Sequence, residues 1–338
     1  MAADQVRTLE DMAVMCGVSA STVSRVLNNE PGISKETRER VLLAAEQHGF
    51  TLQKRKKQAG RAHIHLAVVI PDPSETVNNP FYEMADILNA INSVFARGRK
   101  NVQVLTFSDL RDTIEDSSFS VDGMILAFGS PGQIVRARLR ELGVPCVFLN
   151  RTFDGENCVS CNHVKGMLQL YRHLAGTGHC NIGYLGFRGH PVNSDRVLGY
   201  VSGTAEARGT YSDDAVLMVD AIEDVDTGTA GFFVEKGCDA VMCFNDNFAV
   251  RLINELSGIG VSVPGSMSVS GFDNSPVRKI FRPAITTINL STFEMVFLAA
   301  RWLKDNIVNK RNRILHCEVE GALVEGDTVK KRGQDGRG

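Results

Sequence analysis

The stretch TLEDMAVMCGVSASTVSRVLNNEPGISKETRERVLLAAEQHGF, residues 8–50, decides the fold of the first part of the chain. It begins with apolar residues at positions i, i+3, i+4 and i+7, a spacing that places them on one face of an α-helix. Thr8 stands where its hydroxyl can cap this helix, and Gly17 stands where the helix ends, because glycine tolerates the positive φ of a helix C-terminus. The inward face of the predicted helix consists of Leu9, Met12, Ala13 and Cys16.

A second helix begins at once after the turn at residues 17–19. Ser19 is placed to cap it, and the spacing turns Val23 and either Val26 or Leu27 inward. The turn-forming stretch NNEPG at residues 28–32 ends this helix.

A third helix follows, capped by Ser34 and carrying Glu36 in its first turn, where an acid complements the helix dipole. Its predicted apolar side consists of Val41, Leu42, Ala45 and Phe50. Two helices joined by a glycine-containing turn and braced by a third are typical of a helix-turn-helix.

Charge is distributed unevenly along the 338 residues. The whole chain carries a formal charge of -2, from 37 basic and 39 acidic residues, which alone argues against a nucleic-acid partner. Residues 1–61, however, contain ten Lys or Arg and seven Asp or Glu, so they carry +3 and leave -5 for the remainder. The stretch QKRKKQAGRA at residues 53–62 has five Lys or Arg and no acid, which is typical of a linker. A basic module therefore precedes a more acidic body.

From His63 onward, short β-rich runs alternate with stretches of helical periodicity, the pattern of βαβ units that build parallel sheets. Eight such runs are too many for one sheet, so we expect two doubly wound α/β subdomains, with ligands bound outside the carboxyl ends of their strands. The predicted runs are 64–70, 102–107, 123–127, 146–149, 182–185, 215–219, 240–244 and 268–272. We expect a DNA-binding headpiece at 1–52, a hinge at 53–62, a core of two interleaved subdomains at 63–328 and a flexible tail at 329–338.

The second helix has the chemistry of a recognition helix. Ala20, Ser21 and Arg25 lie at its start or one turn later, where such a helix presents side chains to base edges. An arginine can bind guanine O6 and N7 together, and an alanine can contact a thymine methyl group. Ser19, Thr22 and Ser24 suit contacts to phosphate. The alternative is a plain surface helix with serines at its start.

The whole of residues 8–50 resembles, almost position by position, the headpiece of the LacI/GalR family of bacterial transcriptional regulators. Further landmarks of this family follow in order, among them NPFY at 79–82, GVPCVFLNR at 143–151, DRVLGY at 195–200, DAVMCFNDNFAV at 239–250 and GVSVPGSMSVSGFDN at 260–274. The resemblance covers roughly residues 7–325. It implies a periplasmic-binding-protein-like core that forms a homodimer, binds a small-molecule effector between its subdomains, and so controls affinity for a near-palindromic double-stranded DNA operator.

The resemblance also implies effector-site residues. Arg196 matches a ligand-contacting arginine, and Asp273 matches an aspartate that accepts hydrogen bonds from the effector. Asn245 and Asn150 match polar contacts, and Phe81 or Tyr82 would supply an apolar wall. Each has a structural alternative: Asn245 can cap a helix, Arg196 and Asp273 can pair with each other, and Phe81 can be part of the core.

Two stretches depart from the family pattern. In the family, this linker folds on DNA and a leucine from it wedges into the minor groove. Here the proline and the leucine of that pattern are missing, and Ala59 is the nearest apolar residue. We therefore expect Lys54, Arg55, Lys56 and Lys57 to contact phosphates instead. Residues 219–223 read VDAIE where many relatives place an aromatic, which favours a sugar or sugar derivative over a nucleoside or nucleobase.

Three other functions are compatible with parts of this sequence. An enzyme is disfavoured because no GxGxxG, P-loop, GxSxG or HExxH motif is present. A periplasmic solute-binding protein is disfavoured by the headpiece and by an amino terminus unlike a secretory signal. A binding core with a weakened headpiece stays open because of the altered linker. We expect a cytoplasmic protein, associated with the nucleoid when bound to DNA, with no membrane span and no cofactor.

The eight cysteines are expected to be thiols. Cys158 and Cys161, followed by His163, lack the further ligands of a zinc site, so no metal is expected there.

Overall fold

The computed structural model describes residues 8–27, 32–48, 63–72, 82–95, 100–116, 119–208, 213–310 and 313–332. The chain forms two compact units, residues 1–62 and residues 63–338, and each has hydrophobic clusters of its own. Among the described residues, no helix is long and apolar enough to cross a membrane.

The first unit contains three short helices, α1 (Leu9–Cys16), α2 (Ala20–Leu27) and α3 (Lys35–Gln47). Thr8 caps α1 in a capping box with Asp11, and Gly17 ends it in the left-handed conformation with φ 59°. The hydroxyl of Ser19 accepts from the backbone N–H of Thr22 (3.1 Å), and the hydroxyl of Ser34 caps α3 in the same way. The capping residues predicted for these three helices are therefore confirmed.

The core of the first unit is small and lies where the three helices meet. It consists of Met12, Ala13, Cys16, Val23, Val26, Val41 and Ala45. The prediction that Leu42 faces inward is wrong, because its side chain is 46% exposed. Helix α3 packs on α1 and α2 through a narrow stripe that contains Val41 and Ala45. Leu42 is rotated from Val41 by about 100° around the helix axis, so its side chain falls outside this stripe. Phe50 lies outside the described residues.

The second unit contains a six-stranded sheet in the order β11-β5-β4-β3-β1-β2, and every neighbouring pair in it is parallel. Its strands are β1 (Ile64–Ile70), β2 (Lys100–Thr106), β3 (Gly123–Ala127), β4 (Cys146–Leu149), β5 (Cys158–Cys161) and β11 (His316–Val319). A four-stranded parallel sheet has the order β7-β6-β8-β9. Its strands are β6 (Ile182–Phe187), β7 (Val216–Val219), β8 (Ala240–Cys243) and β9 (Ser268–Ser270).

Helices cover both faces of both sheets. The helices are α4 (Met84–Val94), α5 (Phe107–Thr113), α6 (Gln133–Glu141), α7 (His163–Gly176), α8 (Asn193–Arg208), α9 (Thr227–Glu235), α10 (Asp246–Gly258), the short α11 (Val277–Ile280) and α12 (Thr292–Asn309), with a 3-10 turn η1 at Ile222–Asp224.

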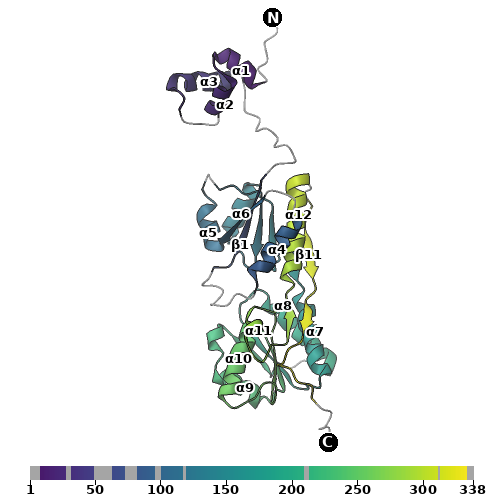
Figure 1. The fold of residues 1–338 in the computed structure, drawn as a ribbon. Coiled ribbons are helices and arrows are strands. Elements are labelled where there is room, and N and C mark those ends of the chain that lie inside the picture. The colour runs from purple at the N-terminus through teal and green to yellow at the C-terminus, as the bar shows by residue number, and fades with distance from the viewer. Residues whose placement is uncertain are drawn as a thin grey trace. The chain divides into compact units, whose positions relative to one another are not determined.

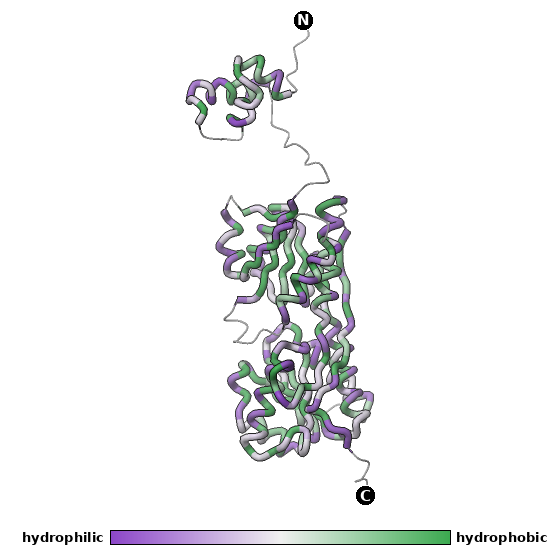
Figure 2. Tube along the Cα trace, in the orientation of Figure 1, coloured by the Kyte–Doolittle hydropathy of each residue, from purple (hydrophilic) through white to green (hydrophobic). Residues whose placement is uncertain are grey.

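Alternate residues of each strand belong to different hydrophobic clusters, as the two-residue period of a strand requires. In β1, Leu66 and Val68 face the cluster that contains α4 and α12, whereas Ala67 and Val69 face the cluster that contains α5 and α6. The second sheet lies likewise between α7 and α8 on one face and α9 and α10 on the other. Figure 2 shows the hydrophobic residues concentrated along these strands. The predicted pair of doubly wound parallel sheets is confirmed.

The chain passes between the two sheets more than once. After β5 it enters the second sheet, and α12 and β11 then return to the first, where α12 packs beside α4 (Figure 1) and β11 pairs with β5 at the edge of the sheet. The short strands β10 (Thr287–Asn289) and β12 (Ala322–Val324) form an antiparallel pair of their own. The sequence did not predict β5, β10, β11 or β12.

Candidate functional site

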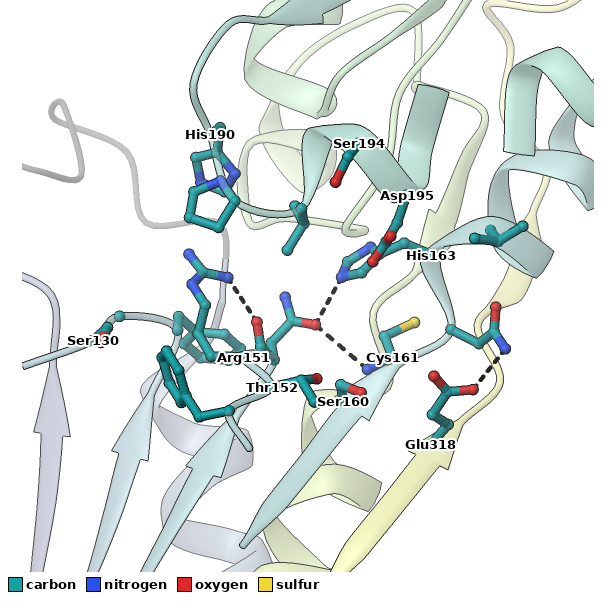
Figure 3. Close-up of a pocket in the computed structure, with 18 of the residues that line it drawn as sticks. Ser130, Arg151, Thr152, Ser160, Cys161, His163, His190, Ser194, Asp195 and Glu318 are labelled. Carbon is teal, nitrogen blue, oxygen red and sulfur yellow. Dashed lines mark hydrogen bonds between the residues drawn. The ribbon is translucent and has the colours of Figure 1, made fainter. Parts of the chain in front are cut away.

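A cavity of about 900 Å³ lies in the second unit at the carboxyl ends of strands from both sheets. In doubly wound folds this is the edge where ligands bind. Residues after β3 and β4, the first turns of α7 and α8, and β11 all contribute to its wall. Figure 3 shows ten of its lining side chains with labels: Ser130, Arg151, Thr152, Ser160, Cys161, His163, His190, Ser194, Asp195 and Glu318.

Close packing of α7 and α8 brings two parts of this wall together. A Cβ atom at Gly199 would lie 2.5 Å from the backbone oxygen of Val164, so only glycine allows this approach of the two helices. Gly203 packs in the same way against the ring of Tyr171. The first turn of α8, which carries Asp195 and Arg196, is thereby held beside His163 at the start of α7.

Of the predicted effector residues that the structure describes, Asn150 alone lines the cavity. It follows β4 with φ 56°, a left-handed conformation that asparagine tolerates better than most residues. Its side-chain oxygen accepts from Nε2 of His163 (2.8 Å) and from the backbone N–H of Cys161 (3.4 Å), contacts that Figure 3 marks. The carboxamide is thereby fixed at the cavity wall.

Arg196 lies directly behind His163 and is 2% exposed. Its Nε donates to Nδ1 of His163 (3.3 Å), so that Nδ1 carries no proton and Nε2 is the donor to Asn150. Burial, together with the positive charges of Arg196 and Arg151, holds the pKa of His163 well below its ordinary value. His163 is therefore neutral and has one defined tautomer.

The charge of Arg196 is compensated inside the protein. Nη2 donates to a carboxylate oxygen of Asp273 at 2.6 Å, and Nη1 donates to the backbone oxygen of Phe244. The guanidinium carbon lies 4.1 Å from the ring centroid of Phe272 and 4.6 Å from that of Phe244. Burial raises the pKa of Asp273, and Arg196 opposes that rise. Arg196 and Asp273 thus form a buried pair beneath the cavity, and neither is among the residues that line it.

Of the other predicted effector residues, Asn245 contacts this pair and Tyr82 packs behind the cavity wall. Asn245 caps α10 through its side-chain oxygen (3.1 Å to the N–H of Phe248), and its amide also bonds Asp273. Tyr82 is buried and stacks at 4.7 Å on Phe128, which lines the cavity, so it supports the wall from behind. Phe81 lies outside the described residues.

Several lining residues escaped prediction. Arg151 stands next to Asn150 and Asp195 next to Arg196, so both were present in the quoted motifs LNR and DRVLGY. His190 and Ser194 come from the loop and first turn after β6, where no local pattern marks a ligand contact. Glu318 comes from β11, a strand that the sequence did not predict.

Helix α2 buries Val23 and Val26, and Ala20 at its start packs partly against the same core. Ser21 and Arg25 are exposed, and Ala20, Thr22 and Ser24 are half-buried. The hydroxyl of Ser19 also bonds the hydroxyls of Ser21 and Thr22, each at 2.8 Å, so it belongs to the helix start. Lys54, Arg55, Lys56 and Lys57 lie outside the described residues.

The Cys158–Cys161 spacing falls on β5, and the two thiols point to opposite faces of the sheet, because they belong to different hydrophobic clusters. Burial raises the pKa of Cys161 to about 12. In the described part of the chain, no three His, Cys, Asp or Glu side chains are grouped so as to hold a metal ion.

Comparison with known proteins identifies both parts of the chain. Residues 8–53 match the family model of bacterial regulatory proteins of the lacI family, and residues 171–329 match the periplasmic binding protein-like domain. The regulator RegA of Clostridium saccharobutylicum is 29% identical over 95% of this chain and 99% of its own length. The repressor PurR of Vibrio cholerae is 25% identical over 96% of this chain and 98% of its own length.

Solved structures share the fold. A complex of the regulator CelR with cellobiose has a TM-score of 0.66 at 24% identity and covers 95% of this chain and 99% of its own. The lac repressor dimer bound to operator and an anti-inducer has a TM-score of 0.61 at 22% identity, over 96% and 99% of the two chains. With a LacI-type DNA-binding domain, a periplasmic-binding-protein-like domain and relatives that are transcription regulators over their full lengths, this chain belongs to the LacI family of DNA-binding transcriptional regulators.

Proposed function

We propose that this regulator is a repressor whose affinity for its operator is set by a small carbohydrate bound in the cavity at the strand ends. The observation that carries the proposal is the lining of that cavity, which combines hydroxyl groups, carboxylates and the fixed carboxamide of Asn150 with apolar rings. Hydroxyl, carboxylate and amide side chains together supply both donors and acceptors for the many hydroxyl groups of a sugar.

Two kinds of observation favour a sugar over a nucleobase. Ser130, Thr152, Ser160 and Ser194 supply hydroxyls, and Asp195 and Glu318 supply carboxylates that accept from ligand hydroxyls. Proteins of the same fold are bound to cellobiose in one case and to ribose, in a regulator from Enterococcus faecium, in another. A nucleoside or nucleobase effector is the alternative that the experiment below also tests.

On the DNA side, we propose that α2 enters the major groove, with Arg25 contacting guanine, and that Lys54–Lys57 contact phosphates. The protein would act as a homodimer on a near-palindromic operator whose half-sites lie about 34 Å apart. In this assignment residues 1–52 form the headpiece, 53–62 the hinge and 63–328 the effector-binding core.

The test begins with selection of bound fragments from genomic DNA by the full-length protein, followed by gel shifts on the selected sequence. Arg25→Ala is expected to weaken operator binding about 5- to 150-fold, the loss of one guanine contact worth about 1–3 kcal/mol. Arg40→Ala, an equal change of charge at an exposed position on α3, is the matched control and is expected to bind as wild type.

A thermal-shift screen against sugars, sugar derivatives and nucleosides then identifies the effector, because a ligand bound by the folded core raises Tm by mass action. A hit is added to the gel shift and is expected to change operator affinity. Failure to select any sequence would favour a binding core with a weakened headpiece. Stabilisation by nucleosides alone would overturn the carbohydrate assignment.

A further inference from the structure

Arg151 lines the cavity of the second unit and has no ion-pair partner of its own in the described structure. Arg151 follows β4, and its Nη1 donates to the backbone oxygen of Asn150 at 2.7 Å. Among the described residues no carboxylate forms an ion pair with it, whereas Arg196 pairs with Asp273 and Lys165 pairs with Glu320 at 2.7 Å. Burial and the nearby charge of Arg196 lower the pKa of Arg151 to about 10, which still leaves it charged, and the charge of Asp273, whose ion pair is with Arg196, only partly opposes this fall.

His190 lies beside this cation and has an unused polar atom. Figure 3 shows the side chain of Arg151 pointing toward His190. Within the described structure, Nδ1 of His190 is buried and has no hydrogen-bond partner, an arrangement that costs free energy unless a ligand supplies one. The ring is held by Phe187, at a centroid distance of 5.4 Å, and by Phe244, at 4.8 Å. Burial and the charges of Arg151 and Arg196 lower its pKa to about 3, so it is neutral.

The opposite side of the cavity is acidic. Asp195 and Glu318 are close enough for the charge of Glu318 to raise the pKa of Asp195, and burial raises it further. Glu318 also accepts from the side-chain amide of Asn162 at 2.8 Å. In Figure 3 both acids lie on the side away from His190. The cavity therefore offers a donor pair at one side and hydrogen-bond acceptors for hydroxyl groups at the other.

We infer that the effector is an acidic sugar, whose anionic group binds between Arg151 and His190 and whose hydroxyl groups face Asp195 and Glu318. This inference rests on the proposed function and narrows its ligand class. A guanidinium binds a carboxylate or a phosphate through paired hydrogen bonds, and a neutral imidazole N–H adds one donor to the same anion. The hydroxyl groups of a neutral sugar could hydrogen-bond Nδ1 of His190, but they would supply no negative charge for the guanidinium of Arg151.

Matched probes test the charge of the ligand. Glucuronate and galacturonate are compared with glucose and galactose, which differ from them only where a carboxylate replaces a hydroxymethyl group, and with glucose 6-phosphate and galactose 6-phosphate. Gluconate is included as an open-chain acid. The measurements are Tm and Kd on the full-length protein. At least one acid is expected to raise Tm where its neutral parent does not, and the phosphates separate a phosphate site from a carboxylate site.

Variants test the position of the anion. Arg151→Gln is expected to weaken binding of the acidic probe about 10- to 100-fold, the worth of hydrogen bonds to a charged group. His190→Phe, which keeps the ring contacts but removes Nδ1, is expected to weaken it about 5- to 10-fold. Arg188→Gln is the control: Arg188 is exposed, pairs with Asp220 at 3.0 Å and is not among the lining residues. It is expected to bind as wild type.

The inference is overturned if neutral sugars stabilise the protein as much as their acids, if no acid in the panel raises Tm, or if Arg151→Gln binds the acid with unchanged Kd. These failures are separable from failure of the proposed function. If a neutral sugar alters operator affinity, the proposed regulatory function stands and the inference of an anionic ligand is wrong. If an acid binds through Arg151 but leaves operator affinity unchanged, the anion site stands and its proposed regulatory role is wrong.

Discussion

The buried pair of Arg196 and Asp273 gives a prediction about stability whose size follows from the structure. Replacing Arg196 by methionine removes the 2.6 Å contact to Asp273, the contact to His163 and the position over the ring of Phe272. The carboxylate of Asp273 is then left buried, with the side-chain amide of Asn245 and the nearby charge of Arg151 to stabilise it. Because removing one partner of a buried ion pair costs about 3–5 kcal/mol, we expect Arg196→Met to lower the free energy of unfolding by about 4 kcal/mol.

A double-mutant cycle separates the pair from its surroundings. Asp273 has φ 99°, a conformation that excludes most side chains, so Asp273→Asn is the suitable change. It removes the charge but keeps an oxygen that accepts from Arg196, and we expect it to cost about 2 kcal/mol. In the double variant neither charge is buried. We therefore expect a total loss of about 4 kcal/mol instead of about 6, a coupling of about 2 kcal/mol.

The assay is urea denaturation followed by tryptophan fluorescence. Trp302 is the one tryptophan in the sequence, and it packs against the main cluster of the second unit, so its signal reports that unit alone. Protein concentration is held constant, because unfolding of an oligomer depends on it. Single changes whose effects add to within about 0.5 kcal/mol would refute the pairing. An Arg196→Met variant that loses less than about 1 kcal/mol would do the same.

Three further predictions concern other parts of the molecule. Burial raises the pKa of Asp246 to about 7, above the ordinary value of about 3.9, so the folded protein retains a proton that the unfolded chain releases. The contribution of Asp246 to the free energy of unfolding is therefore most favourable below about pH 4, and it is lost as the pH rises from about 4 to about 7. Relative to wild type, Asp246→Asn is expected to gain about 2 kcal/mol in free energy of unfolding between pH 5 and pH 7. Urea titrations in which the two proteins change equally over this range would contradict the prediction. Alanine at all of Lys54–Lys57 is expected to flatten the slope of log affinity against log salt by up to about 3.6, at about 0.9 per phosphate; an unchanged slope counts against phosphate contacts. Met12→Ala, in the small core of the first unit, is expected to cost about 2–5 kcal/mol and to abolish operator binding while the Trp302 transition stays in place. Retained operator binding would show that this core tolerates the change.

Local patterns predicted those elements whose signals lie within a few neighbouring residues. The caps at Thr8, Ser19 and Ser34 depend on a side chain and an amide three residues apart. Strands β1, β3 and β4 are continuous apolar runs bounded by polar or turn residues, and their predicted bounds agree with the structure. Strand β5 has only the residues CVSC, and β11 only HCEV. They form because they pair with each other across about 158 positions of sequence, as between Cys158 and His316, and no local pattern contains that pairing.

The same limit explains what the sequence missed at the site. A motif indicates which side chains lie near which strand end. The structure places Asn150, Arg196 and Asp273, all from such motifs, close to one another at one edge of the fold. A motif does not decide between contact with a ligand and the structural alternative that Arg196 and Asp273 pair with each other: they are 77 residues apart, and in the structure they pair at 2.6 Å. Their direct contact with an effector stays a prediction. Because Asp273 pairs with Arg196 and Glu320 pairs with Lys165, Arg151 has no ion-pair partner among the described lining residues. The inferred negative charge of the ligand follows from this distribution of ion pairs.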